Sequence, residues 1–177
     1  MKGSLLIVDD EPDILLVMSA NLKKEGYEVD TAEDGVEALK KVEARDYDAI
    51  IVDHQMPRLT GMAFLERLRD GDTPAAGQRD IPVIVVTAYG TIEMAVKAMK
   101  DGAYSYLTKP IDLADLARAI LRAIRRRDSL IEQANLNQWL KEEVAVRTAE
   151  LRRERAKLER LSVATLEALV NALEAKD

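Results

Sequence analysis

The residues Leu5-Leu6-Ile7-Val8-Asp9-Asp10 are the strongest indicator of the fold class of this 177-residue chain. Four apolar residues in succession, without alternating polar residues, are typical of a strand that is buried on both faces, as in a parallel sheet. Two acids follow at once, and Pro12 then stands where a helix can begin. Apolar residues at helical spacing run from Ile14 to Leu22, and Gly26 ends that pattern. The sequence therefore predicts a strand, an acidic turn and a helix.

The same alternation is repeated along the first two thirds of the chain. Further strands are expected over residues 28–32, 49–52, 82–86 and 103–107. Further helices are expected over residues 34–44, 62–69, 91–100 and from 112 onward, with a loop over 71–80. Strands that alternate with helices indicate an α/β fold with a parallel sheet, whose right-handed crossovers place helices on both faces. In such sheets ligands bind beyond the carboxyl ends of the strands.

Composition narrows the classes of function. Without cysteine the chain can hold no disulfide, thiolate zinc site or cysteine nucleophile, and a single histidine, His54, excludes a multi-histidine metal centre. Residues 1–110 carry 13 basic and 20 acidic side chains, a net charge of −7, whereas residues 111–177 carry 13 and 12, a net charge of +1. An acidic body argues against nucleic acid as a direct partner and suits a divalent cation.

No part of the chain is expected to enter a membrane. No apolar run approaches the roughly 20 residues that a helix needs to cross a bilayer. The start of the chain, Met1-Lys2 followed by a short strand-like run and then acids, does not resemble a signal peptide. We therefore expect a cytoplasmic protein without a membrane partner.

Polar side chains stand where four of the five predicted strands end. Asp9 and Asp10 follow the first strand, and Asp53 follows the third. Thr87 follows the fourth strand, and Lys109 comes just after the fifth. Because the carboxyl ends of parallel strands share one edge of the sheet, we expect a pocket of three carboxylates, a hydroxyl and an ammonium. Clustered carboxylates repel one another unless a cation lies among them, and oxygen ligands suit Mg²⁺.

The same pocket could perform phosphoryl transfer. A carboxylate can act as a nucleophile toward phosphorus and form an acyl phosphate. The metal ion would screen the approaching phosphoryl group, while Lys109 would pair with its oxygens and Thr87 would donate a further hydrogen bond.

Each of these residues also has a structural interpretation. Asp9 or Asp10 alone would cap the helix that follows in about half of such cases. His54 adjoins Asp53, but neighbouring residues of a strand point to opposite faces, so we expect a structural or solvated histidine. Tyr106 could serve half-buried packing alone. Five polar residues at successive strand ends are much harder to explain in this way.

Four short motifs occur together in the order that defines one family. They are Val8-Asp9-Asp10-Glu11, Asp53-His54-Gln55-Met56-Pro57 with Gly61, Thr87-Ala88 and Lys109-Pro110. The set resembles the receiver domain of bacterial two-component response regulators, and we assign a receiver domain to residues 1–125. The resemblance implies a doubly wound, flavodoxin-like sheet of five parallel strands in the order 2-1-3-4-5. It also implies a regulatory phosphoacceptor that is no enzyme beyond its own phosphorylation and dephosphorylation.

The resemblance assigns the metal and phosphate ligands residue by residue. Asp53 matches the phosphoacceptor, which takes a phosphoryl group from a phosphohistidine of a sensor histidine kinase. Asp10 matches a direct ligand of Mg²⁺, and Asp9 matches a ligand through water. Asp53 is itself expected in the metal shell, which the backbone carbonyl of Gln55 completes.

The remaining motif residues match the response to phosphorylation. Thr87 and Lys109 match the pair that binds the phosphoryl oxygens, and a cis bond is expected between Lys109 and Pro110. Tyr106 matches the aromatic switch, which turns inward when Thr87 moves toward the phosphate. Tyr89, like the residue two positions after the phosphoacceptor, is expected to tune the lifetime of the phosphate.

Residues 112–177 contain neither glycine nor proline, and we expect one long helix there. A seven-residue repeat runs through it: Leu130, Asn137, Val144, Leu151 and Leu158, with Leu140 and Leu161 three residues after members of that series. This is a coiled-coil seam, interrupted at its second position by Arg147 and Glu154. A helix this polar is marginal alone, so we expect a homodimer through a coiled-coil linker over residues 126–160. The alternative is a solvated single helix with many ion pairs.

The final stretch begins Leu161-Ser162-Val163-Ala164-Thr165-Leu166-Glu167 and continues in alanine, leucine and glutamate. It resembles the opening helix of HD-GYP-type cyclic-di-GMP phosphodiesterase domains. We therefore expect residues 161–177 to be the start of a truncated downstream effector domain, whose metal ligands are missing because no histidine follows residue 54.

Two other classes of protein compete with the signalling interpretation. A structural dimerisation module with a receiver fold would need none of the motif residues, and their presence disfavours it: Asp10, Asp53, Thr87 and Lys109. The stalk of a hybrid sensor kinase would need a phosphoaccepting histidine, which the long helix lacks. The run Arg125-Arg126-Arg127 stands among acids and is expected to be a solvated helix face, with no nucleic acid as partner.

Overall fold

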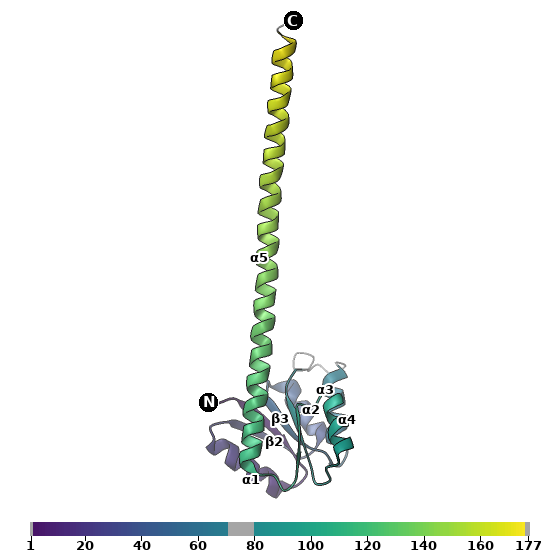
Figure 1. The fold of residues 1–177 in the computed structure, drawn as a ribbon. Helices are drawn as coiled ribbons and strands as arrows, with labels where there is room; N and C mark the ends of the chain where they lie inside the picture. The colour runs from purple at the N-terminus through teal and green to yellow at the C-terminus, as the bar shows by residue number, and fades with distance from the viewer. Residues whose placement is uncertain (1, 71–79, 176–177) are drawn as a thin grey trace. The chain divides into compact units, whose positions relative to one another are not determined.

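The computed structural model of this protein describes residues 2–70 and 80–175. The chain divides into two compact units, Met1–Ser129 and Leu130–Asp177. Strands and helices alternate in the first unit (Figure 1). The strands are β1 (Ser4–Val8), β2 (Glu28–Ala32), β3 (Ala49–Asp53), β4 (Val83–Thr87) and β5 (Ser105–Thr108). The helices are α1 (Pro12–Lys24), α2 (Gly35–Ala44), α3 (Gly61–Asp70), α4 (Ile92–Lys100) and α5 (Leu113–Glu174).

The sheet confirms the predicted fold class. Among the described residues it has five strands in the order β2-β1-β3-β4-β5, and every neighbouring pair is parallel. The order reverses between β1 and β3, and at such a switch point the connecting segments leave a crevice beyond the strand ends. Most predicted boundaries agree within a residue or two. The loop expected over residues 71–80 lies outside the described residues except for its last one.

The apolar runs of the strands are buried on both faces, as their lack of alternation predicts. One face of the sheet, with Leu5, Ile7 and Ile51, packs against α1 and the start of α5. The opposite face, with Leu6 and Val52, packs against α2, α3 and α4. Figure 1 shows the same two layers of helices around the strands. The body therefore has its own core on each side of the sheet.

Side-chain caps mark the start of four of the helices. At α3, Thr60 accepts a hydrogen bond from the nitrogen of Ala63 at 3.2 Å. Asp34 accepts hydrogen bonds from the backbone nitrogens of Val36 (2.7 Å) and Glu37 (2.9 Å) at the start of α2. Thr91 caps α4 through the nitrogen of Met94 at 3.2 Å. Asp112 accepts a hydrogen bond from the nitrogen of Ala114 at the start of α5 at 2.7 Å. Such caps satisfy backbone donors that have no partner within the helix.

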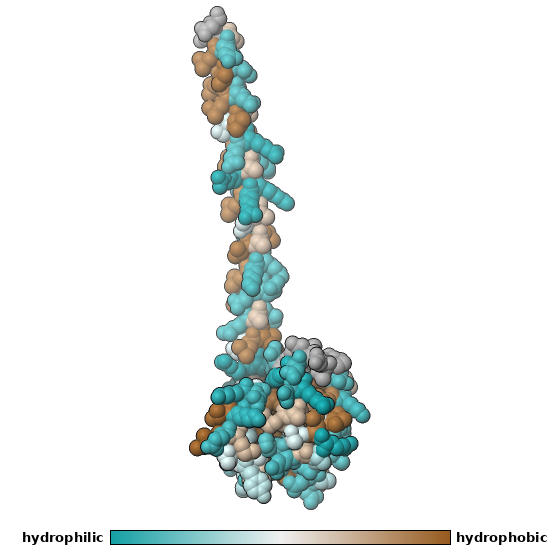
Figure 2. Space-filling model, turned by 90° about the vertical axis from the view of Figure 1, so that its right-hand side faces the viewer, coloured by the Kyte–Doolittle hydropathy of each residue, from teal (hydrophilic) through white to brown (hydrophobic). Residues whose placement is uncertain are grey.

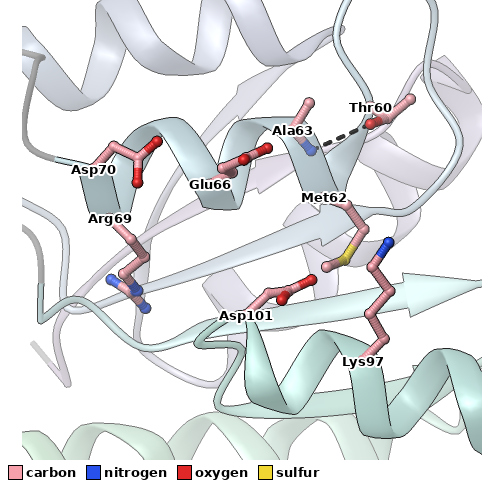
Figure 3. A pocket seen from close by; sticks show the side chains of 8 residues that line it. All are labelled: Thr60, Met62, Ala63, Glu66, Arg69, Asp70, Lys97 and Asp101. Atoms are coloured by element: carbon pink, nitrogen blue, oxygen red, sulfur yellow. Dashed lines mark hydrogen bonds between the residues drawn. The ribbon is translucent and has the colours of Figure 1, made fainter.

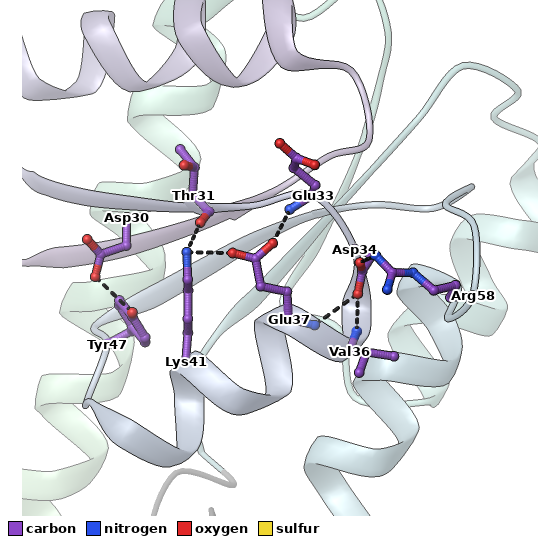
Figure 4. A network of polar contacts seen from close by, with 9 residues as sticks. All are labelled: Asp30, Thr31, Glu33, Asp34, Val36, Glu37, Lys41, Tyr47 and Arg58. Atoms are coloured by element: carbon purple, nitrogen blue, oxygen red, sulfur yellow. Dashed lines mark hydrogen bonds and ion pairs between the residues drawn. The ribbon is translucent and has the colours of Figure 1, made fainter.

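A network of charged side chains covers β2, which forms one edge of the sheet (Figure 4). Lys41 pairs with Glu37 at 2.8 Å and also donates to the carbonyl of Thr31. The buried hydroxyl of Tyr47 donates to Asp30 at 2.9 Å. Charges along an edge strand disfavour pairing with a strand of another molecule. We assign this network to stability and not to a site.

In the second unit α5 continues to Glu174. Its large apolar side chains are exposed, with Leu151 at 66% and Leu158 at 68%. Despite its length, neither this helix nor any other in the described residues is apolar enough to cross a membrane. The division of the chain at residues 125 and 160 stays a prediction, although the two compact units separate nearby, after Ser129.

Candidate functional site

The ends of three strands bring two carboxylates to one ammonium. The Nζ atom of Lys109 lies 3.0 Å from Oδ2 of Asp9 and 2.8 Å from Oδ1 of Asp53. A third acid, Glu11, is 3.5 Å from the same nitrogen, but its side chain is exposed. Asp9 and Asp53 are buried, and Lys109 is only 17% exposed. Three of the predicted site residues therefore meet in one partly buried pocket.

One ammonium shared by two buried carboxylates leaves the pocket with a net negative charge. Burial raises the pKa of Asp53, although the hydrogen bond from Lys109 opposes this effect and the charge of Asp9 adds to it. Burial alone would lower the pKa of Lys109, but its hydrogen bonds with Asp53 and Asp9 outweigh burial and raise it. Lys109 therefore remains fully charged, but its single positive charge does not neutralise both carboxylates around it.

Backbone groups fix the orientation of each carboxylate. Oδ2 of Asp53 accepts a hydrogen bond from the nitrogen of Gln55 at 2.8 Å, so this oxygen is held while Oδ1 faces the lysine. Oδ1 of Asp9 accepts a hydrogen bond from the nitrogen of Glu11 at 2.9 Å. Helix α1 has no side-chain cap, so neither Asp9 nor Asp10 serves as its cap. Such bonds organise the site before any ligand arrives.

A glycine lies directly against the backbone of Asp53. A Cβ atom added at Gly61 would stand 2.2 Å from the carbonyl oxygen of Asp53, far inside van der Waals contact. The nitrogen of Gly61 donates to the carbonyl of His54 at 3.1 Å, which closes the turn between β3 and α3. The turn that presents Asp53 therefore has no room for a side chain at this position.

The lysine is positioned by the turn after β5. The Lys109–Pro110 peptide bond is cis, as expected from the sequence. The backbone nitrogen of Lys109 donates to the carbonyl of Thr87 at 2.7 Å, which ties the ends of β4 and β5 together. The lysine thus starts beside Thr87 and reaches across the pocket to Asp53.

Thr87 is buried, and its hydroxyl accepts a hydrogen bond from the nitrogen of Tyr89 at 3.2 Å. Tyr106 is half-buried, and its hydroxyl is enclosed without a hydrogen-bond partner among the described residues. A Cβ atom added at Gly90 would lie 3.6 Å from the Tyr106 ring. The loop after Thr87 therefore lies next to the tyrosine that the sequence assigns as its switch.

The side chains of Asp10 and Gln55 do not join the buried pair, although the backbone nitrogen of Gln55 donates to Asp53. Both are exposed, and the side chain of Asp10 forms no hydrogen bond or ion pair within the part of the chain that the structure describes. Over residues 2–70 and 80–175, no group of three or more acidic or imidazole side chains is arranged to hold a metal ion. The expected cluster of three carboxylates is thus a buried pair, Asp9 and Asp53, with an exposed neighbour.

His54 and a hollow between α3 and α4 take no part in the contacts around Lys109. His54 is half-buried. Its Nδ1 atom is enclosed and has no hydrogen-bond partner among the described residues, so it forms no hydrogen bond with Asp53. A hollow of about 540 Å³ between α3 and α4 is lined by Met62, Arg69 and Lys97, among others (Figure 3). None of the pocket residues around Lys109 lines this hollow.

Comparison with known families matches residues 5–121 to the response regulator receiver domain. This chain therefore belongs to the receiver domain family. Receiver domains are regulatory phosphoacceptors of two-component systems, and they interact with sensor kinases and with effector domains. They are not catalytic enzymes, and they generally bind Mg²⁺ at the phosphorylation site.

Similar curated proteins include several transcriptional regulators. The transcriptional regulatory protein PrrA of Mycobacterium tuberculosis is 38% identical over 125 residues, which are 71% of this chain and 51% of that protein. The DNA-binding dual master transcriptional regulator RpaA of Synechocystis is 37% identical over 130 residues, 73% of this chain and 52% of that protein. The chain thus spans about half the length of these relatives. Their names run partly against the expectation that nucleic acid is no partner.

Solved structures agree with the fold. A receiver domain from Clostridium thermocellum has a TM-score of 0.64 and 35% identity, and the match covers 72% of this chain and 98% of that one. NtrX from Brucella abortus has a TM-score of 0.69 and 30% identity, with 77% of this chain and 30% of that one covered.

The residues of the pocket fit a divalent cation. Asp9 and Asp53 both lie within 3.0 Å of a single positive nitrogen, so their carboxylates converge on one point. The donors there are oxygens, which Mg²⁺ prefers. Burial disfavours the charged form of Asp53 and raises its pKa, and a bound cation would offset this effect by stabilising the carboxylate.

Proposed function

We propose that this chain is the receiver part of a response regulator and that Asp53 accepts the phosphoryl group. The observation that supports the proposal is the pairing of the buried Asp53 carboxylate with Lys109 at 2.8 Å, beside a second buried acid, Asp9. In the proposed site Asp9, Asp10, Asp53 and the carbonyl of Gln55 hold Mg²⁺. When bound, Mg²⁺ supplies positive charge that screens the carboxylates from the incoming phosphoryl group.

For the transfer, the phosphoryl donor must reach a carboxylate oxygen of Asp53 whose orientation is fixed. A carboxylate oxygen of Asp53 forms a bond to phosphorus while the phosphorus–nitrogen bond of a phosphohistidine breaks, and the imidazole nitrogen takes up a proton. Lys109 already contacts this carboxylate, so its ammonium is in place to pair with phosphoryl oxygens. Thr87 stands at the end of the neighbouring strand, and its hydroxyl is the proposed hydrogen-bond donor to the phosphoryl group.

The proposed response couples Thr87 to Tyr106. The Thr87 hydroxyl accepts a hydrogen bond from the nitrogen of Tyr89 at 3.2 Å and donates a long one, at 3.5 Å, to the carbonyl of Tyr89. A phosphoryl oxygen would offer this hydroxyl a charged acceptor instead. Movement of this loop would change the packing around Tyr106, whose hydroxyl has no partner among the described residues. Such a change shifts the balance of two states only if phosphorylation favours one of them.

The proposed partners follow from the class of domain and from the exposed surface. The phosphoryl donor is a sensor histidine kinase, and an apolar hollow of about 410 Å³ beside Lys109, lined also by Val17 and Ile111, offers it a contact surface. The helix beyond Ser129 forms a homodimer and leads to a downstream effector. That this effector is a cyclic-di-GMP phosphodiesterase remains a prediction from residues 161–177. We propose no membrane partner and no direct contact of these residues with nucleic acid.

Incubation with acetyl phosphate and Mg²⁺, followed by intact mass measurement, tests the proposed function. We expect the mass of one phosphoryl group to be added, and chelation of the metal to prevent it. Asp53→Asn is expected to gain nothing, whereas the matched control Asp128→Asn, an exposed acid on α5, gains as the parent does. An unmodified parent, or equal modification of Asp53→Asn, would contradict the proposal.

A further inference from the structure

The helix over residues 130–161 exposes a row of apolar side chains. Figure 2 shows apolar residues among charged ones along this part of the chain. Members of the row have exposed fractions of 45–68%: Leu130, Leu140, Val144, Leu151, Leu158 and Leu161. Apolar residues that recur every 3.5 residues on average pack against a second, supercoiled helix. Such a seam is narrower than the apolar stripe of a helix that packs on a globular body.

Two positions of each seven-residue repeat form the seam and face the partner helix. Leu130, Asn137, Val144, Leu151 and Leu158 hold the first position, and Gln133, Leu140, Arg147, Glu154 and Leu161 hold the second. In a parallel, in-register pair each residue faces its own copy, whereas in an antiparallel pair a first-position residue faces a second-position one. The two orientations therefore sort the same side chains into different layers.

Parallel pairing in register matches apolar residues with apolar residues. Each leucine of the seam, and Val144, then faces an identical side chain. In an antiparallel pair that aligns Leu158 with Leu140, Val144 faces Glu154 and Leu151 faces Arg147. A shift by one repeat moves the mismatch and does not remove it, because Asn137 or Leu151 then faces Glu154. Burying an apolar residue against a charge is unfavourable.

The polar seam residue points to the same orientation. Asn137 faces Asn137 in the parallel pair, where the two amides can donate to and accept from each other. In the antiparallel alignment above, Asn137 faces Leu161 and its amide has no partner in the layer. A buried amide without a hydrogen bond costs free energy, so the antiparallel pair is penalised here as well.

Charges beside the seam also complement a parallel copy. Glu150 and Arg155 occupy the two flanking positions that meet across a parallel pair, and Arg155 of the second copy also lies next to Glu154. Arg147 is paired within its own helix, at 3.2 Å from Glu143 and 3.1 Å from Glu150, so its layer adds less repulsion than a bare charge. In an antiparallel pair Lys141 instead approaches Arg155.

The seam ends at a definite residue. After Leu161 the next two seam positions hold the small residues Thr165 and Ala168, and the large side chains shift to Leu166 and Leu169. From there the apolar stripe is wider than a coiled-coil seam, with Val163, Val170 and Leu173 also exposed. The change of pattern falls at the boundary predicted for the next domain.

We infer that two copies of this chain pair through residues 130–161 as a parallel, in-register coiled coil. The inference rests on the homodimer of the proposed function and adds its orientation and register. Parallel pairing brings the carboxyl ends of the two helices together, so that whatever follows residue 161 is presented as a pair. The charged layers at Arg147 and Glu154 weaken the middle of the seam.

Single cysteines test the orientation, because the chain has none of its own. Val144→Cys places a thiol in a layer where it meets itself only in the parallel, in-register pair. Ala149→Cys, on the helix face away from the seam, is the matched control. Under mild oxidation we expect Val144→Cys to form a disulfide-linked dimer more than about tenfold faster than the control, since pairing raises the local thiol concentration.

A mixture of Leu140→Cys and Leu158→Cys, one of them carrying a mass tag, completes the test. The parallel pair predicts disulfides within each variant, and a predominant disulfide between the two variants would overturn the inference in favour of an antiparallel pair. Equal rates for Val144→Cys and Ala149→Cys, or monomers alone in sedimentation, would overturn the pairing itself. Phosphorylation by acetyl phosphate, measured on the same samples, separates either failure from failure of the receiver.

Removal of a charged layer gives a second readout. Glu154→Leu replaces a like-charge layer by an apolar one and is expected to tighten the dimer about tenfold or more. Glu142→Leu, an exposed control outside the seam, is expected to leave the dissociation constant within about a factor of two. A dissociation constant that is unchanged or raised by Glu154→Leu would contradict the assigned register.

Discussion

The two units of this chain use apolar side chains in opposite ways. In the body, Ile50 and Phe64 are fully buried against other parts of the same chain. In the helical segment, Leu151 and Leu158 are each exposed by about two thirds. Burying such a side chain is worth about 1.5–3 kcal/mol, so the body holds the free energy of its fold within itself. The helical segment obtains that free energy only from a partner.

Removal of residues 130–177 makes the largest change that this comparison predicts. The shortened chain is expected to remain folded and to accept phosphate, because its core lies wholly within Met1–Ser129. Association is expected to be lost at every concentration tested by sedimentation velocity. If the shortened chain formed the same dimer, the seam would not be its interface. If it failed to fold, the two units would not be independent.

Lys109→Met tests the body at its most charged point. The change leaves Asp9 and Asp53 buried and facing each other without the ammonium that both now contact. Breaking a buried ion pair from one side costs about 3–5 kcal/mol, and we expect about 3 kcal/mol here in the free energy of unfolding by urea. Lys100→Met, an exposed lysine of α4, is the control. A loss below about 1 kcal/mol would show that the carboxylates do not depend on this lysine.

Asp34→Ala is expected to cost about 1.5 kcal/mol, because it removes the cap of α2 and the pair with Arg58. Hydrogen bonds from the nitrogens of Glu37 and Val36, with a contribution from Arg58, hold the pKa of Asp34 below its usual 3.8. A lowered pKa in the folded state means that the carboxylate stabilises the fold above that pH and that this contribution is lost as the pH falls.

Asp34→Asn separates the two effects. Asparagine keeps the cap but carries no charge, so its deficit relative to the parent should shrink as the pH falls from 7 to below 3.8. Urea unfolding at several pH values measures both variants. A deficit of Asp34→Asn that does not change with pH would contradict the assignment of charge to this cap.

Asp53→Asn is expected to raise stability by about 1 kcal/mol when metal is chelated. Burial raises the pKa of Asp53, so the folded state disfavours its charge, and stability falls as the pH rises through that pKa. The gain should therefore be seen near pH 7 and vanish below the usual value of 3.8, where the carboxyl is protonated in both states. Matched thermal melts check this, and a lower midpoint for the variant at neutral pH would contradict it.

Much of the body could be predicted from the sequence, because short uninterrupted apolar runs bounded by turn residues are typical of strands that are covered on both faces. That pattern placed β1 and β3 within a residue of their observed bounds, with Asp53 itself as the last residue of β3. It misplaced the start of β5, expected at 103 and observed at Ser105. Ala103 is buried in the turn after α4, where its nitrogen donates to Ala98. Burial in a turn and burial in a strand look alike in the sequence.

The site could be predicted only as a set of strand ends. Sequence order shows which residue follows each strand, but not how far a lysine reaches, so it does not predict the direct contacts of Lys109 with Asp9 and Asp53. Strand order alone does not distinguish Asp9 from Asp10; only the family resemblance gave them different roles, and the structure buries Asp9 alone. The contact of Glu11 with Lys109 had one available signal, its place directly after the two acids.

The decisive measurement is the location of the phosphoryl group on the phosphorylated chain. After reaction with acetyl phosphate and Mg²⁺, reduction with borohydride converts an acyl phosphate into an alcohol at the modified residue, which peptide mass spectrometry then locates. We expect this mark at Asp53 and nowhere else, in the full chain. A mark at Asp9 or Asp10 instead, or no mark under conditions that leave the protein folded, would contradict the assignment of this pocket as a phosphoacceptor site.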